Sequence, residues 1–155
     1  MDLNQEVADA ADPNTDCARL VELSGCHSID MVWLEALANP SFPLSVLLAY
    51  ETHPDSRFRD VLAHRADLPR DAAWRLAEDE EGIVRDGLAS STFHTAVLLR
   101  VAQDKFSCIR GMARLRLAKH VLPSAHERIE ALAELRSLHP KRVAKAKKLL
   151  ASLFS

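Results

Sequence analysis

The sequence predicts an all-α fold, arranged as an α-solenoid of four to five helical hairpins of about 25 residues each. Leucine and alanine, which favour helices, occur 23 times each among 155 residues, whereas valine and isoleucine together occur 14 times. The chain has only four glycines, which argues against sandwiches, barrels and glycine-rich nucleotide-binding sheets. The third observation is an internal repeat, and a fixed repeat period is typical of stacked architectures.

The repeat is clearest in the segments Phe58-Arg-Asp-Val-Leu-Ala63 and Val84-Arg-Asp-Gly-Leu-Ala89, whose matching residues lie 26 positions apart. The same shift carries Pro43 onto Pro69. One helix pair cannot bury its apolar face alone, so we expect the units to stack and share a continuous core. Further copies, one of them weaker, begin at Ile109 and Val32.

Each unit is expected to hold two short helices. In the second unit, residues 43–50 are apolar on one face, and Phe58, Val61 and Leu62 keep the i, i+3, i+4 spacing of a buried helix face. His53-Pro54 separates the two helices, because the residue before a proline disfavours the helical conformation. The same reasoning places helices near residues 14–24, 28–37, 43–52, 56–65, 69–78, 81–89, 93–103, 106–119, 124–137 and 140–153.

The helices are expected to form one domain. Residues 1–10 are predicted to be a flexible N-terminus, and residues 11–155 a single α-solenoid domain, because no glycine- or serine-rich linker divides them. Terminal units should match the repeat poorly, since they cap the stack. The expected repeats span residues 11–37, 38–62, 63–88, 89–113 and 114–155.

Ala38-Asn-Pro-Ser-Phe-Pro43, with the segments that begin at Arg59 and Arg85, resembles the variant leucine-rich repeat family of bacteria, in which α-helices alternate with short 3₁₀-like helices. Residues 76–85 also resemble a HEAT repeat. The resemblance covers residues 11–114 and implies a right-handed stack of one of these two types. The family's founding member carries an N-terminal cysteine cluster for an iron–sulfur centre. This chain has only Cys17 and Cys26 in that region, so no such role is carried over.

An arginine recurs at the same position of successive units, as Arg59, Arg85 and Arg110. These arginines could form a row of guanidinium groups that binds phosphates, or they could form a structural ladder. His53, Asp79 and Asp104 each lie six residues before one of these arginines. In HEAT-like repeats an aspartate and an arginine at this separation form a ladder between neighbouring units, which pairs opposite charges and satisfies backbone groups at helix ends. The predicted ladder comprises Arg59, Asp79, Arg85, Asp104 and Arg110.

The predicted function is a non-enzymatic scaffold that binds another protein, because solenoids offer long curved surfaces. Tyr50, Trp74 and Arg100 are candidate anchors, since aromatic and arginine side chains concentrate binding energy. The alternative is a HEAT-like protein that binds nucleic acid, because residues 105–155 hold twelve basic and three acidic residues. Against it, no aromatic residues interleave with these bases and the net charge of the chain is −2. The alternative would use Arg114, Arg116, Lys119, Lys145, Lys147 and Lys148.

Motifs of catalysis or metal binding are missing from the sequence, which has neither H-E-x-x-H nor paired C-x-x-C. The three cysteines are expected to be reduced and mostly buried. The first residues do not resemble a signal peptide, and no apolar stretch is long enough to span a membrane. We therefore predict a cytoplasmic protein with no cofactor, no metal and no membrane partner.

Overall fold

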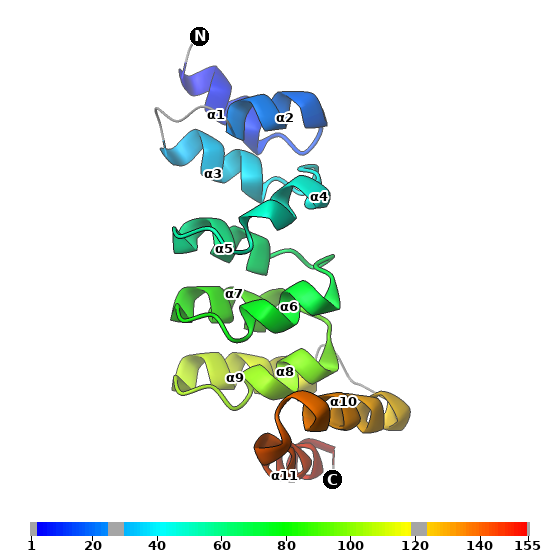
Figure 1. Ribbon diagram of the computed structural model, residues 1–155. Helices are drawn as coiled ribbons and strands as arrows, with labels where there is room; N and C mark the ends of the chain where they lie inside the picture. The colour runs from blue at the N-terminus through cyan, green and yellow to red at the C-terminus, as the bar shows by residue number, and fades with distance from the viewer. Residues whose placement is uncertain (1–2, 25–29, 119–123, 155) are drawn as a thin grey trace.

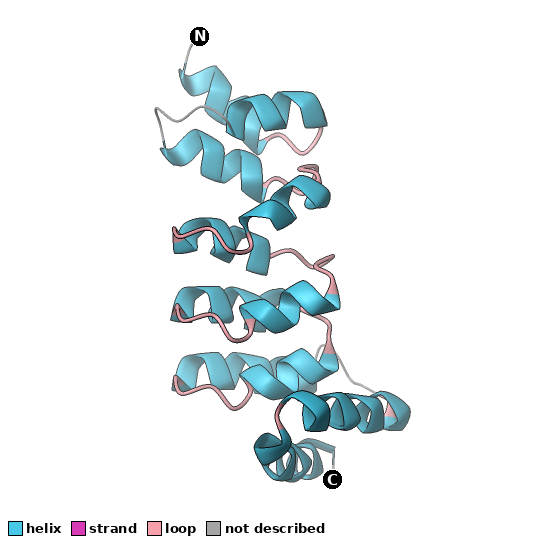
Figure 2. Ribbon diagram, in the orientation of Figure 1, coloured by secondary structure: helices cyan, strands magenta, loops and turns pink. Residues whose placement is uncertain are grey.

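The chain folds into helices joined by loops. The computed structural model describes residues 3–24, 30–118 and 124–154, and no residue of these ranges lies in a β-strand (Figure 2). The predicted all-α class is therefore confirmed for the described part of the chain.

Eleven α-helices and two short 3₁₀-helices are found in these ranges. The α-helices are α1 (Leu3–Ala11), α2 (Cys17–Ser24), α3 (Asp30–Ala38), α4 (Leu44–Leu47), α5 (Ser56–Ala63), α6 (Arg70–Leu76), α7 (Gly82–Ser91), α8 (Thr95–Val101), α9 (Ser107–Arg116), α10 (Ala125–Leu138) and α11 (Val143–Phe154). The 3₁₀-helices are η1 (Leu48–Tyr50) and η3 (Pro140–Arg142).

The helices are arranged in two columns along an elongated molecule (Figure 1). Helices α3, α5, α7 and α9 follow one another in one column, and each packs against the next. Helices α4, α6 and α8 lie in front of them in a second column. Matching positions of the repeat have the same environment, since Leu62, Leu88 and Ala113 are all fully buried. Burying a leucine side chain stabilises a fold by about 1.5–3 kcal/mol, so Leu62 and Leu88 each stabilise the packing of neighbouring helices.

Prolines and aspartates set the starts of these helices. Pro43 and Pro69 immediately precede α4 and α6, and their φ angles of −61° and −59° suit entry into a helix. Pro140 opens η3. Asp55 caps α5 by accepting the backbone N–H of Arg57 at 2.9 Å. Pro123, which immediately precedes the helix expected over residues 124–137, lies outside the described residues.

A flexible terminus was expected over residues 1–10, but from Leu3 onward this segment is a helix. Leu3–Ala11 forms α1, which packs against α3, and Ala10 is fully buried. The side chain of Asn39, itself buried, donates hydrogen bonds of 2.8 Å to the carbonyls of Ala10 and Asp12. These contacts attach α1 to the rest of the stack.

The last two helices depart from the pattern of the earlier units. Helices α10 and α11 have 14 and 12 residues, whereas α5 to α9 have 7 to 10. Helix α10 packs against α8 rather than extending the column of α9 (Figure 1). Helices α10 and α11 therefore do not repeat the geometry of the preceding units, and α10 covers part of the second column.

Two further expectations can be compared with the structure. Cys17 and Cys108 are exposed, so the expectation of mostly buried cysteines is wrong for both, while Cys26 lies outside the described residues. Each exposed thiol sits near the start of a short helix, where the helix turns that side chain away from the core. In the described ranges, every helix is too short or too polar to cross a membrane.

Candidate functional site

The three recurring arginines share one set of backbone contacts. Each lies in the first turns of its helix and donates from Nη1 to two carbonyls of the loop before that helix. These carbonyls belong to the loop before α5, α7 or α9, outside the helix, so the arginine satisfies backbone groups that the helix itself does not pair. The accepting carbonyls are those of His53 (2.5 Å) and Pro54 (3.2 Å) for Arg59, Asp79 (2.5 Å) and Glu80 (3.1 Å) for Arg85, and Asp104 and Lys105 (both 2.8 Å) for Arg110.

Two of the arginines also reach a carboxylate of the following unit. Arg59 Nε donates to Asp79 Oδ2 at 2.7 Å, and Arg85 Nε donates to Asp104 Oδ2 at 2.6 Å. Burial, the largest single influence, would raise the pKa of Asp79 and Asp104. The guanidinium hydrogen bond, a backbone N–H and the nearby positive charges together outweigh it, so both pKa values lie below the usual range. The carboxylates are therefore ionised. Each arginine–aspartate contact, called a filled rung below, is a buried ion pair between neighbouring units.

The third arginine, Arg110, lacks this second contact, and its position is called the open rung below. Among the described residues, the hydrogen bonds of Arg110 go only to the carbonyls of Asp104 and Lys105, and no carboxylate pairs with it. Within the part of the chain that the structure describes, helix α9 is the last of its column, and no further unit supplies an aspartate there. Arg110 is accordingly half-buried, whereas Arg59 and Arg85 are buried.

A hollow of about 510 Å³, called the basic hollow below, lies beside the open rung at Arg110. Arg110 and Arg114 of α9 line one side, and Lys145 and Lys148 of α11 line another. The one carboxylate in the lining, that of Asp104, is already paired with Arg85, so the hollow has a net positive charge. Its size is that of sites that hold ligands of several atoms rather than a single ion. The arrangement suits an anionic group on a larger molecule.

The basic residues proposed for nucleic-acid contact are divided among separate places. Arg114, Lys145 and Lys148 meet at the basic hollow. Arg116 instead donates to the carbonyls of Ser91 and Thr92 at 3.1 and 2.7 Å, with its guanidinium over the ring of Phe93. Lys119 lies outside the described residues.

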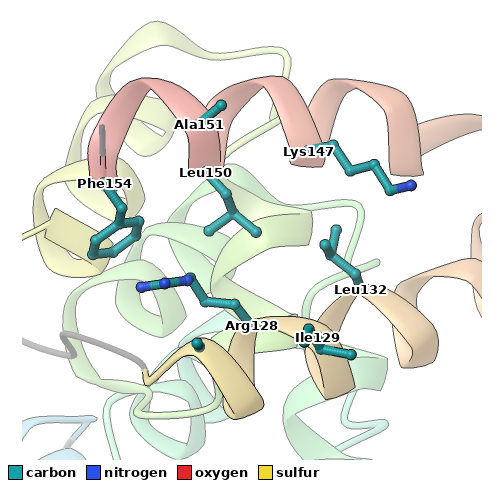
Figure 3. Close-up of a pocket in the computed structure, with 8 residues that line it drawn as sticks. Arg128, Ile129, Leu132, Lys147, Leu150, Ala151 and Phe154 are labelled. Carbon is teal, nitrogen blue, oxygen red and sulfur yellow. The ribbon is translucent and has the colours of Figure 1, made fainter.

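Lys147 lines a different hollow, one between α10 and α11 of about 470 Å³ (Figure 3). Its walls are mainly apolar, and Arg128 lies over the ring of Phe154 at 4.6 Å. Figure 3 shows Lys147 at the opposite end of this hollow from Phe154. The C-terminal lysines therefore do not form one continuous strip.

The three candidate protein-binding anchors are engaged within the chain. Tyr50 stacks on Phe58, with ring centroids 4.9 Å apart. Trp74 is 8% exposed and donates its Nε1 hydrogen to Glu134 of α10. Arg100 is buried and bonds Glu78 through Nη2 at 2.7 Å. Trp74 and Arg100 are both buried and are therefore not exposed anchors.

His64, which immediately follows α5, is a titratable group that the sequence reasoning missed. Its Nδ1 lies 3.0 Å from the carbonyl oxygen of Asp60 and 3.3 Å from Asp60 Oδ1. Hydrogen bonding to this carboxylate raises the pKa of His64 to about 9, so the ring is charged at neutral pH. Gly87 of α7 lies against the pair, where a Cβ would come within 2.7 Å of the ring. The sequence feature that could have revealed this pair is Gly87, which stands at the repeat position that holds Val61 and Met112 in other units.

The acidic run at residues 78–81 is largely explained by internal pairing. Glu78 pairs with Arg100 and Asp79 with Arg59. Within the ranges that the structure describes, no group of three or more histidine, cysteine, aspartate or glutamate side chains is placed to hold a metal ion.

Comparisons of the chain with protein-family models, with curated proteins and with solved structures find no match.

Proposed function

We propose that this chain is a right-handed α-solenoid of variant leucine-rich or HEAT-like repeats that binds another protein and has no enzymatic activity. The recurrence of the same core position and the same arginine contacts in successive units supports the repeat assignment. The short 3₁₀-helix η1, which directly follows α4, supports the variant leucine-rich type.

The open rung at Arg110 is the observation that carries the proposed function. In the two complete rungs, a guanidinium group and a carboxylate hold one helical unit against the next. Arg110 has the same backbone contacts but no carboxylate among the described residues, and it lies at the rim of the basic hollow. A partner protein with an acidic side chain would complete the contact, and charge-assisted hydrogen bonds of this kind are among the stronger ones in proteins.

A capture experiment tests this function. The protein is immobilised and exposed to lysate of its native cell, in parallel with the double variant Arg110→Glu, Lys148→Glu. Wild type is expected to retain one protein at stoichiometric level after nuclease treatment, and the double variant to lose it because the hollow now repels acids. Lys147→Glu, on the other hollow, is the matched control and should retain the partner. Release by nuclease, or equal capture by the double variant, would contradict the proposal.

The gathering of Arg114, Lys145 and Lys148 also favours a second function, binding to nucleic acid. Binding of this kind would weaken linearly with the logarithm of the salt concentration, because it releases counterions from phosphates. The nuclease step of the capture experiment separates it from protein binding.

A further inference from the structure

The three arginines of the ladder each border a hollow, and the charge of the lining differs. It is negative around Arg59, balanced around Arg85 and positive around Arg110. Beside Arg59 the following unit supplies Asp79, and beside Arg85 it supplies Asp104. Beside Arg110, where the described residues supply no further repeat of this kind, the lining contains Lys145 and Lys148. The chain thus contains two filled examples of a site that is open in its third copy.

We infer that the segment recognised at this hollow is an aspartate at the start of a helix of the partner protein, with its carboxylate against Arg110 and near Lys145 and Lys148. This inference rests on the proposed function and names the chemistry of the partner. Arg110 would use the Nε edge of its guanidinium, since Nη1 already donates to two carbonyls. Arg59 uses the same edge for Asp79, through Nε at 2.7 Å and Nη2 at 3.0 Å.

The geometry of the filled rungs favours aspartate over glutamate. Asp79 Oδ1 accepts the backbone N–H of Glu81 at 2.9 Å, and Asp104 Oδ1 accepts that of Phe106 at 2.9 Å. Each carboxylate therefore holds its own turn and the arginine of the preceding unit at once. Aspartate forms this turn readily because its side chain reaches the N–H two residues on, and the longer glutamate side chain places its carboxylate elsewhere.

The spread of charge favours a polypeptide over a nucleic acid. Nucleic acids gain affinity from contacts to many phosphates along a line. Here the basic hollow is a single site, since Arg116 bonds carbonyls between α7 and α8 and Lys147 lines the hollow between α10 and α11. No aromatic side chain lines the basic hollow to stack on a base.

A peptide taken from the chain itself provides the probe. The peptide copies residues 77–91, which present Asp79 before a helix, and a covalent staple joins positions 86 and 90 because isolated short helices are marginal in water. Binding to the full-length protein is followed by fluorescence anisotropy. The peptide with Asp79→Asn, and the peptide with Asp79→Glu, are each expected to bind about tenfold more weakly. The protein variant Arg110→Gln should bind all three peptides equally, and Lys147→Gln should keep the wild-type preference.

The inference fails if the stapled peptide does not bind, if the asparagine or glutamate peptide binds as well as the aspartate one, or if folded Arg110→Gln keeps the preference. Displacement of the peptide by a short DNA duplex at comparable concentration would also overturn it. Thermal melting of Arg110→Gln shows whether that variant is folded. If a partner is captured through Arg110 but the peptides are not distinguished, only the inference fails; if capture fails as well, the proposed function falls with it.

Discussion

Replacing Arg85 by alanine is expected to lower the free energy of unfolding by about 3 kcal/mol, because removing one partner of a buried ion pair leaves the other charge uncompensated. The side chain of Asp104 is 3% exposed and would lose its guanidinium partner. The carbonyls of Asp79 and Glu80 would lose their donor at the same time. Urea denaturation at neutral pH, followed by far-ultraviolet circular dichroism, measures the loss.

Arg110→Ala is the matched control for this change. Arg110 has the same two backbone contacts in the next unit, but no carboxylate among the described residues depends on it. Its loss should cost about 1 kcal/mol or less, the net worth of ordinary hydrogen bonds near solvent. Equal losses for the two variants would contradict the distinction between a filled and an open rung.

Replacing Trp74 by alanine is expected to cost about 3 kcal/mol or more, since large core truncations remove both buried area and packing. Trp74 contacts two residues of the C-terminal segment: Glu134 accepts its Nε1 hydrogen, and the ring of His139 lies 5.8 Å away between centroids. The change should therefore loosen α10 as well as lower overall stability. Hydrogen exchange monitored by mass spectrometry would show faster exchange in α10 than in α5 and α7.

Trp74→Phe separates packing from hydrogen bonding. Phenylalanine keeps an aromatic ring between α6 and α10 but cannot donate to Glu134, so its effect should be smaller than that of alanine. Unchanged protection of α10 in the alanine variant would show that Trp74 does not hold this helix in place.

Most helices were predictable because their signals are local. Proline before α4 and α6, and the i, i+3, i+4 spacing in α5, are read within one turn of the chain. Helix α1 was missed because the contact that ties it down, from Asn39 to Ala10, joins residues 29 apart. The helix at α10 was predicted, but not its position on α8, because Trp74 and Glu134 are 60 residues apart and no sequence pattern links them.

The sequence pattern selected the residues of the ladder but not their pairing. The six-residue spacing selected the arginines and aspartates of the ladder, and in the structure this spacing joins each arginine to a backbone carbonyl. The carboxylate bonds instead reach forward by 20 residues from Arg59 and 19 from Arg85. The basic hollow depends on α11 lying near α9, a tertiary arrangement that composition and charge alone cannot specify.

The exchange rates of the three arginine Nε hydrogens test the open rung most directly, and nuclear magnetic resonance measures them in the free protein. The Nε hydrogens of Arg59 and Arg85 are bonded to buried carboxylates and should exchange slowly with water. That of Arg110 should exchange much faster, because its Nε has no such partner among the described residues. Equal protection of all three would mean that Arg110 is already satisfied, and the proposed binding site would not exist.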